Sequence, residues 1–201
     1  EQTLKRFNVS SLEEFSTTSK IGNPYTTKSS FDKFIFAYEN DNWVKLYKPL
    51  DEKKYKFQYL GTKEQGFIFG WKQLPENGEL LIITGGEKDV MTLAAKGFNA
   101  ITLNSETATL PKNIVDELKL RFKTILVLYD NDETGLKQSN ILAVAHGLHR
   151  LVLPTLQNNG KDISDYFANG ETIEHFNDLL LTAIQTPAPI ELDVEKSVYN
   201  A

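Results

Sequence analysis

The sequence predicts an α/β fold in which a parallel sheet is flanked by helices. Four apolar segments lack the polar alternation of half-exposed strands, which is typical of strands covered on both faces. They are residues 79–84, 99–104, 124–129 and 148–154. Helical patterns separate them, at residues 87–97, 111–122 and 133–147. This alternation of strand and helix predicts parallel strands joined by right-handed crossovers.

The segments on either side of this alternation have different patterns. Residues 1–78 are predicted to form a small β-rich (α+β) subdomain. Within it, Ser10 to Glu14 resembles a capping box that opens a short helix, and Thr17 to Ser30 reads as a loop. An amphipathic helix is expected over 172–185, followed by a tail or linker that starts at the prolines after Thr186. The expected division is therefore 1–78, 79–170 and 171–201.

Acidic residues follow the strand that ends at Tyr129. Asp130 and Asp132 are two apart, which places them on one face of an extended chain at roughly 6–7 Å. Ligands of parallel sheets bind beyond the carboxyl ends of the strands, and neighbouring carboxylates there favour a cation. Mg²⁺, an oxygen-binding ion that works on phosphates, is the natural candidate. A solvated acidic turn is the alternative, whereas a calcium loop is excluded by Ile141 at its twelfth position.

Polar residues also follow the other three strands. Gly85 and Gly86 lead into a helix that begins with Glu87 and contains Asp89. Acids in a first helical turn stabilise the helix dipole, so this structural role explains Asp89 at least as well as a functional one. The remaining strands are followed by Glu106 and by the pair Lys161 and Asp162, whose simplest explanation is a local salt bridge.

Three motifs together resemble the Toprim domain. They are GGEKD after the first strand, DNDETG with Lys137 after the third, and KDISDYF after the fourth. The resemblance is greatest to phage and mobile-element primase-helicases and the bacterial-type DNA primase core. Residues 45–71 are similar to the RNA-polymerase subdomain that precedes Toprim in those primases. The resemblance implies Mg²⁺-dependent nucleotidyl transfer that makes RNA primers from nucleoside triphosphates on single-stranded DNA.

The resemblance also implies roles for individual residues. The expected catalytic residues are Glu87, Asp130, Asp132 and Lys137. The expected ligands of Mg²⁺ or Mn²⁺ are Glu87, Asp130, Asp132, Glu106 and Asp162. The expected contacts to nucleic acid or nucleotide are Lys45, Lys54, Lys56, Lys88 and Lys161.

One position departs from the Toprim pattern. The family has its catalytic glutamate where this chain has Gly85, while Glu87 and Asp89 match the next two acids of the motif. Either Glu87 or Glu106 then supplies the missing oxygen ligand, or the domain is a degenerate module that docks or positions nucleic acid. A Toprim-type nuclease that uses the same acids is a further alternative.

Composition excludes several kinds of domain and several cellular locations. It has no cysteine, which excludes disulfides and a thiolate zinc ribbon, and no P-loop, which excludes a helicase motor. No segment reaches transmembrane length and no signal peptide is evident, so a cytoplasmic protein without membrane contact is expected. Because the chain begins at Glu1, it is expected to be part of a longer protein whose zinc-ribbon or helicase domain lies elsewhere.

Charge is uneven along the chain. Residues 1–78 have 12 Lys+Arg against 10 Asp+Glu, whereas the remainder has 10 against 17. Between residues 45 and 63, lysines alternate with aromatic residues. This pattern suits a strand with one packed face and one cationic face that follows phosphates or stacks bases. An ordinary hairpin with solvated lysines is the alternative.

Overall fold

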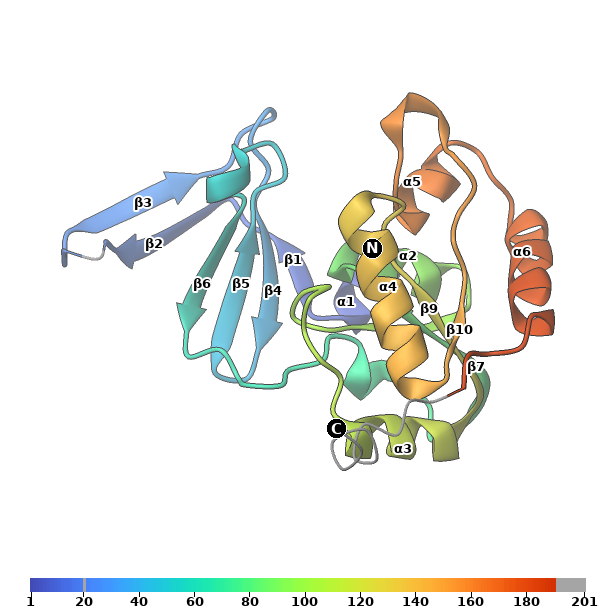
Figure 1. Cartoon of the computed structure of the whole chain (residues 1–201). Helices are drawn as coiled ribbons and strands as arrows, with labels where there is room; N and C mark the ends of the chain where they lie inside the picture. The colour runs from blue at the N-terminus through green and yellow to red at the C-terminus, as the bar shows by residue number, and fades with distance from the viewer. Residues whose placement is uncertain (20, 191–201) are drawn as a thin grey trace. The chain divides into compact units, whose positions relative to one another are not determined.

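The computed structural model describes residues 1–19 and 21–190, and the chain divides into two compact units (Figure 1). The first unit is Glu1–Phe67 and the second begins at Ile68. Residues 68–78, which the sequence-based division assigned to the first subdomain, group here with the second unit.

The first unit is built from antiparallel strands. A four-stranded sheet has the order β1-β4-β5-β6, and β2 and β3 form a separate hairpin. The strands are β1 (Val9–Ser11), β2 (Glu14–Thr18), β3 (Pro24–Lys28), β4 (Phe36–Asn40), β5 (Trp43–Tyr47) and β6 (Phe57–Gly61). Two short helices accompany them, α1 (Gln2–Arg6) and the 3₁₀ turn η1 (Lys53–Tyr55). A small core of Phe15, Ile35, Ala37 and Leu46 holds the unit together.

The expected helix at Ser10 and the expected loop over 17–30 are wrong. Ser10 pairs with Ala37 in the sheet, and its hydroxyl donates to Glu39 at 2.9 Å. In the hairpin, the Ser16 and Thr26 hydroxyls share a hydrogen bond of 2.8 Å, and Phe15 is buried. Cross-strand pairing with distant residues overrides the local capping pattern here, because strand formation depends on context more than on propensity.

The second unit contains the predicted parallel sheet. Its strand order is β10-β9-β7-β8, and all three pairings are parallel. The strands are β7 (Gly78–Thr84), β8 (Asn99–Thr102), β9 (Phe122–Leu128) and β10 (His149–Arg150). The α-helices are α2 (Glu87–Ala95), α3 (Lys112–Arg121), α4 (Glu133–His146), α5 (Ile163–Ala168) and α6 (Ile173–Gln185). Two 3₁₀ turns, η2 (Trp71–Gln73) and η3 (Gln157–Asn159), complete the unit. The predicted fold class is therefore confirmed.

Both faces of the parallel sheet are covered. Leu81, Ile83 and Val127 point to one face and pack in a core with residues of α3 and α4. Ile82 and Leu126 alternate with them and are fully buried as well, so the opposite face is also covered. The lack of polar alternation in these strands follows from this double burial.

The ends of the sheet differ in detail from the prediction. β10 pairs with β9 over only two residues, and the chain then continues without regular structure through Leu153 and Pro154. The predicted helix over 172–185 is observed as α6, whereas most of the expected tail, 191–201, lies outside the described residues. Among the helices of the described residues, none has both the length and the apolar character needed to cross a membrane.

Candidate metal centre

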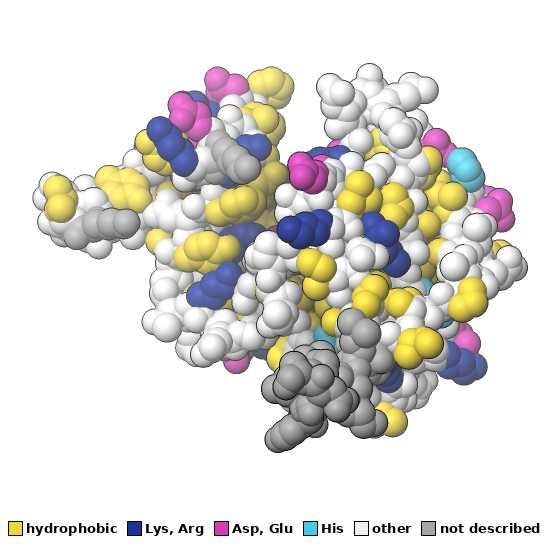
Figure 2. Space-filling model, in the orientation of Figure 1, with side chains coloured by type: hydrophobic (Ala, Val, Ile, Leu, Met, Phe, Trp, Pro, Cys, Tyr) yellow, Lys and Arg dark blue, Asp and Glu magenta, His cyan; other side chains and the backbone are white. Residues whose placement is uncertain are grey.

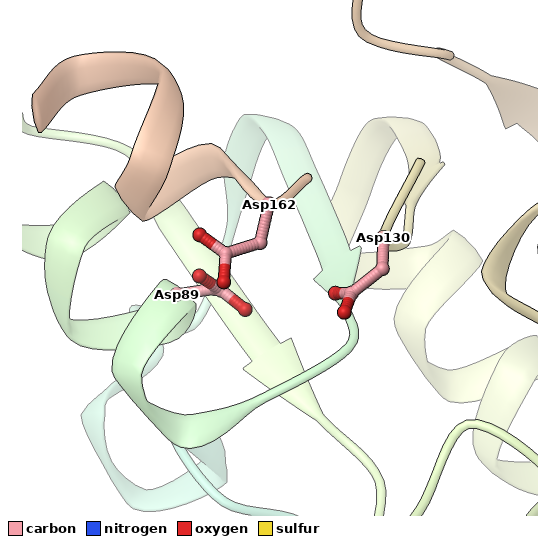
Figure 3. Close-up of side chains that lie close together, drawn as sticks. All are labelled: Asp89, Asp130 and Asp162. Atoms are coloured by element: carbon pink, nitrogen blue, oxygen red, sulfur yellow. The ribbon is translucent and has the colours of Figure 1, made fainter. Parts of the chain in front are cut away.

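Three aspartates converge at the carboxyl edge of the parallel sheet (Figure 3). Asp89 lies on α2 after β7, Asp130 follows β9, and Asp162 precedes α5. One carboxylate oxygen of each lies within 4.8 Å of the others. Because β7 and β9 are parallel neighbours, the loops that follow them emerge side by side, which brings residues distant in sequence together.

Asp89 is the most buried of the three, at 3% exposure. The Ser164 hydroxyl of α5 donates to its Oδ1 at 2.6 Å. Burial, with the nearby charge of Asp162, raises the pKa of Asp89 to about 7. The sequence reasoning missed Asp89 as a site residue, because a first-turn acid also stabilises its helix; the match to the aspartate of the Toprim motif was the signal that pointed to it.

Asp130 and Asp132 lie in different environments although they are two residues apart. Asp132 caps α4 and accepts from the Gly135 backbone N–H at 3.0 Å, which lowers its pKa. Asp130 is more buried, and burial raises its pKa against the opposing effect of Lys161. A Cβ on Gly135 would collide with the carbonyl oxygen of Asp130, so only glycine lets α4 begin this close to the turn.

A lysine from another loop lies between these two carboxylates. Lys161 Nζ is 2.6 Å from Asp130 Oδ2 and 2.7 Å from Asp132 Oδ2. The Asn131 backbone N–H donates to the Lys161 carbonyl at 2.7 Å, which ties the two loops together. The lysine ammonium therefore occupies a place suited to a cation, and the surrounding donors are carboxylate oxygens of the kind that Mg²⁺ and Mn²⁺ prefer.

Asp162 combines a helix cap with an ion pair. It accepts from the Asp165 backbone N–H at 2.8 Å at the start of α5, and its Oδ2 is 2.9 Å from Lys88 Nζ. Lys88 also lies 3.8 Å from Asp165. The ion pair of Asp162 is thus with a lysine of α2, and not the local pair with Lys161 that the sequence suggested.

The other predicted residues of this unit lie around the aspartates. Glu106 is half-buried in the loop after β8, and burial, together with Asp130 and Asp132, raises its pKa. Glu87 is the first residue of α2 and does not belong to the close aspartate group found among the described residues. Lys137 is exposed on α4. The metal and catalytic roles of these residues stay predictions.

One lysine of the predicted cationic strand face of the first unit is buried instead of exposed. Lys45 is only 7% exposed, and its Nζ lies 4.4 Å from the centre of the Phe57 ring. It shares a face of β5 with Trp43 and Tyr47, because residues two apart on a strand point the same way. Lys54 is exposed in η1, 3.4 Å from Glu52, and Lys56 is half-buried just before β6.

Several aromatic side chains of this unit are exposed. Tyr55, Phe57 and Tyr59 are all about half exposed, and the Tyr47 and Phe57 rings stack at 5.2 Å. In Figure 2 hydrophobic side chains (yellow) form separate patches on the visible surface of the hairpin and the sheet, with Lys and Arg side chains (dark blue) among them. These exposed rings could stack on bases, as the predicted role requires. Contact with nucleic acid itself stays a prediction.

Comparison with known proteins gives similarity in structure and none in sequence. No protein-family profile and no curated protein sequence match the chain. The chain resembles the primase fragment of the bacteriophage T7 primase-helicase (17% identity, TM-score 0.55, covering 91% of this chain and 70% of that one). It also resembles the DnaG catalytic core (16%, 0.64, 91% and 69%) and the DnaG catalytic domain bound to single-stranded DNA (18%, 0.59, 90% and 60%). These likenesses confirm the predicted resemblance at the level of the fold: the chain has the fold of primase catalytic cores.

Proposed function

We propose that this chain is the catalytic core of a DNA primase, which joins ribonucleotides into a primer on a single-stranded DNA template in a metal-dependent reaction. The observation that carries the proposal is the convergence of Asp89, Asp130 and Asp162, with Asp132 beside them, at the carboxyl edge of the sheet. Carboxylates packed this closely repel one another unless a cation joins them, and they lie at the ligand-binding edge of a fold shared with primases.

Asp130 and Asp132 would be the principal ligands for Mg²⁺ or Mn²⁺, and Asp162 and Asp89 would complete the acidic surroundings. When bound, such ions lower the pKa of an attacking hydroxyl and neutralise charge on the phosphates. The caps on Asp132 and Asp162 hold these carboxylates in place, and Ser164 holds Asp89. Preorganised ligands of this kind reduce the cost of ordering the site on binding.

Lysines surround the acids and would contact the triphosphate. A divalent cation held by Asp130 and Asp132 would take the place of the Lys161 ammonium, which would then be available to bind phosphate. Lys137 on α4 and Lys88 on α2 flank the same edge of the sheet. A lysine is suited to this role because its ammonium is a compact charge on a flexible stem.

The partners that follow from this role are a single-stranded DNA template and nucleoside triphosphates. One structure of the same fold is a DnaG domain bound to single-stranded DNA, and another is a fragment of a primase-helicase. A zinc ribbon or a helicase domain, on another part of the protein or on a partner, is expected to act with this chain. The aromatic residues of β5 and β6 are the proposed contact surface for the template.

A primer-synthesis assay tests the proposal. The chain is incubated with single-stranded DNA, labelled nucleoside triphosphates and Mg²⁺ or Mn²⁺, and short RNA products are resolved on a gel. Wild type is expected to make primers, and Asp130→Asn/Asp132→Asn to lose at least about 99% of the product, since it removes the central ligands. Asp178→Asn, which removes an exposed charge on α6, is the control and is expected to retain activity.

Gly85 favours a second candidate, a non-catalytic module that positions nucleic acid. The Toprim pattern has its catalytic glutamate at this position. For that candidate, the expected result is binding of single-stranded DNA with no primer synthesis and no metal-dependent difference between wild type and the double variant. Nicking of supercoiled plasmid in the same buffers would instead indicate a nuclease.

A further inference from the structure

The space beside Gly85 is filled by two carboxylates that come from other strands. A Cβ built on Gly85 would lie 2.8 Å from Glu106 Oε1 and 3.1 Å from Asp130 Oδ1. Ordinary contacts of a Cβ are longer than about 3.4 Å, so a side chain at position 85 and the present Glu106 carboxylate exclude each other.

Glu106 comes to this position from a different loop. It reaches the sheet edge from the loop after β8, and the backbone of Asp130 lies close to its carboxylate. The side chain is half-buried, and its carboxylate lies with that of Asp130 around the place that a Cβ of Gly85 would occupy. Repulsion between neighbouring carboxylates costs free energy. A cation bound between them would offset this cost.

We infer that Gly85 and Glu106 are a matched pair: the missing side chain at position 85 admits the Glu106 carboxylate as a cation ligand next to Asp130. The inference rests on the proposed metal-dependent function and assigns the ligand that the Gly85 departure leaves open. Glu87 is the rival for this role, but it is Glu106 whose oxygen lies beside Asp130 at the place of the absent side chain.

The pair has a distinctive consequence for substitutions at Gly85. The backbone of Gly85 is not in the left-handed region, so alanine is conformationally acceptable there. The atom that its Cβ would meet first is the far end of a flexible side chain, which can move away at little cost. Gly85→Ala should therefore fold normally and still displace the Glu106 carboxylate from the site.

Calorimetric titration of Mn²⁺ into the full chain tests the inference. Gly85→Ala and Glu106→Gln are each expected to weaken Mn²⁺ binding by about tenfold or more, as loss of one ligand or its support does. The double variant should bind no more weakly than Glu106→Gln alone, because both changes remove the same carboxylate. Exchange of the two residues, Gly85→Glu with Glu106→Gly, should restore binding to within about threefold of wild type.

Two controls accompany the titration. Asp178→Asn, which removes an exposed charge on α6, should bind Mn²⁺ as wild type does. Thermal unfolding without metal should give similar midpoints for wild type and Gly85→Ala, which excludes misfolding as the cause of weak binding.

The outcomes separate this inference from the proposed function. If Mn²⁺ binds wild type, Gly85→Ala and Glu106→Gln equally, or if Gly85→Ala alone binds as wild type does, the matched pair is refuted while the metal site stands. If wild type does not bind Mn²⁺, the metal-dependent function and the pair fail together.

Discussion

Several acids of the site have two tasks at once. Asp132 and Asp162 each cap a helix and also contribute a carboxylate to the acidic edge of the sheet. Asparagine caps helices about as well as aspartate, whereas its uncharged amide is a weaker ligand than a carboxylate for Mg²⁺. Asp→Asn variants at these positions therefore separate the structural task from the functional one, and alanine variants would not.

The ion pairs of Lys161 lead to a prediction about metal binding by individual residues. Its single ammonium pairs with both Asp130 and Asp132, so a divalent cation must displace it. Lys161→Gln is expected to bind Mn²⁺ about tenfold more tightly than wild type while losing primer synthesis, because the competing charge and the proposed phosphate contact disappear together. Calorimetry and the primer assay measure the two effects.

The matched control for this variant is Lys123→Gln. Lys123 is exposed at the other end of β9, where it pairs with Glu79 at 2.7 Å. Lys123→Gln removes the same charge far from the site, and it should change neither Mn²⁺ affinity nor primer synthesis. Weaker Mn²⁺ binding in Lys161→Gln would contradict the competition.

At the scale of elements, the turn from β9 to α4 depends on one glycine. Gly135 packs against the backbone of Asp130, and any Cβ there would meet the Asp130 carbonyl. Gly135→Ala is expected to destabilise the fold by about 2–3 kcal/mol, since backbone atoms cannot move aside as a flexible side chain can. It should also weaken Mn²⁺ binding, because Asp130 and the start of α4 shift together.

Denaturant unfolding measures the predicted loss of stability. Thr134→Ala is the control, since Thr134 is the exposed neighbour of Gly135 in the same helical turn. It should change stability by no more than about 0.5 kcal/mol. Equal stability of Gly135→Ala and wild type would show that a Cβ at position 135 does not clash with the Asp130 carbonyl.

At the scale of the whole molecule, burial of Asp89 couples stability to pH. The pKa of Asp89 is raised from 3.8 to about 7 by folding, so the folded chain keeps a proton that the unfolded chain loses between these values. Without metal, the free energy of unfolding should therefore fall as pH rises from about 4 to about 7, by on the order of 4 kcal/mol from Asp89. Glu106 and Asp130, whose pKa values are also raised, act in the same direction.

Asp89→Asn tests this dependence. In EDTA its free energy of unfolding should vary less between pH 4.5 and 8 than that of wild type, by roughly the contribution of Asp89. The amide oxygen of the substituted side chain can still accept the Ser164 hydrogen bond, so the variant isolates the charge. Added Mg²⁺ should stabilise wild type most at pH 8, where its carboxylates are ionised. A wild-type stability that rises between pH 5 and 7 in EDTA would contradict the assigned burial.

The sequence alone determined the parallel sheet and the edge at which its acids gather. Uninterrupted apolar strands alternating with helical patterns specify a sheet buried on both faces, and the motif glycine at position 135 marks the tight turn after Asp130. These features are local: periodicity, caps and turn residues are read within about ten residues of chain.

Tertiary structure alone decided which side chains meet. The strand at residues 9–11 forms through pairing with residues 36–38, against a local helix signal, and the burial of Lys45 depends on the register of β5. Asp89 lies in the acidic group, and Glu106 occupies the space at Gly85, because loops from different strands converge at one edge of the sheet. Such contacts join residues tens of positions apart, and their geometry depends on the packing of the whole sheet rather than on any short stretch of sequence.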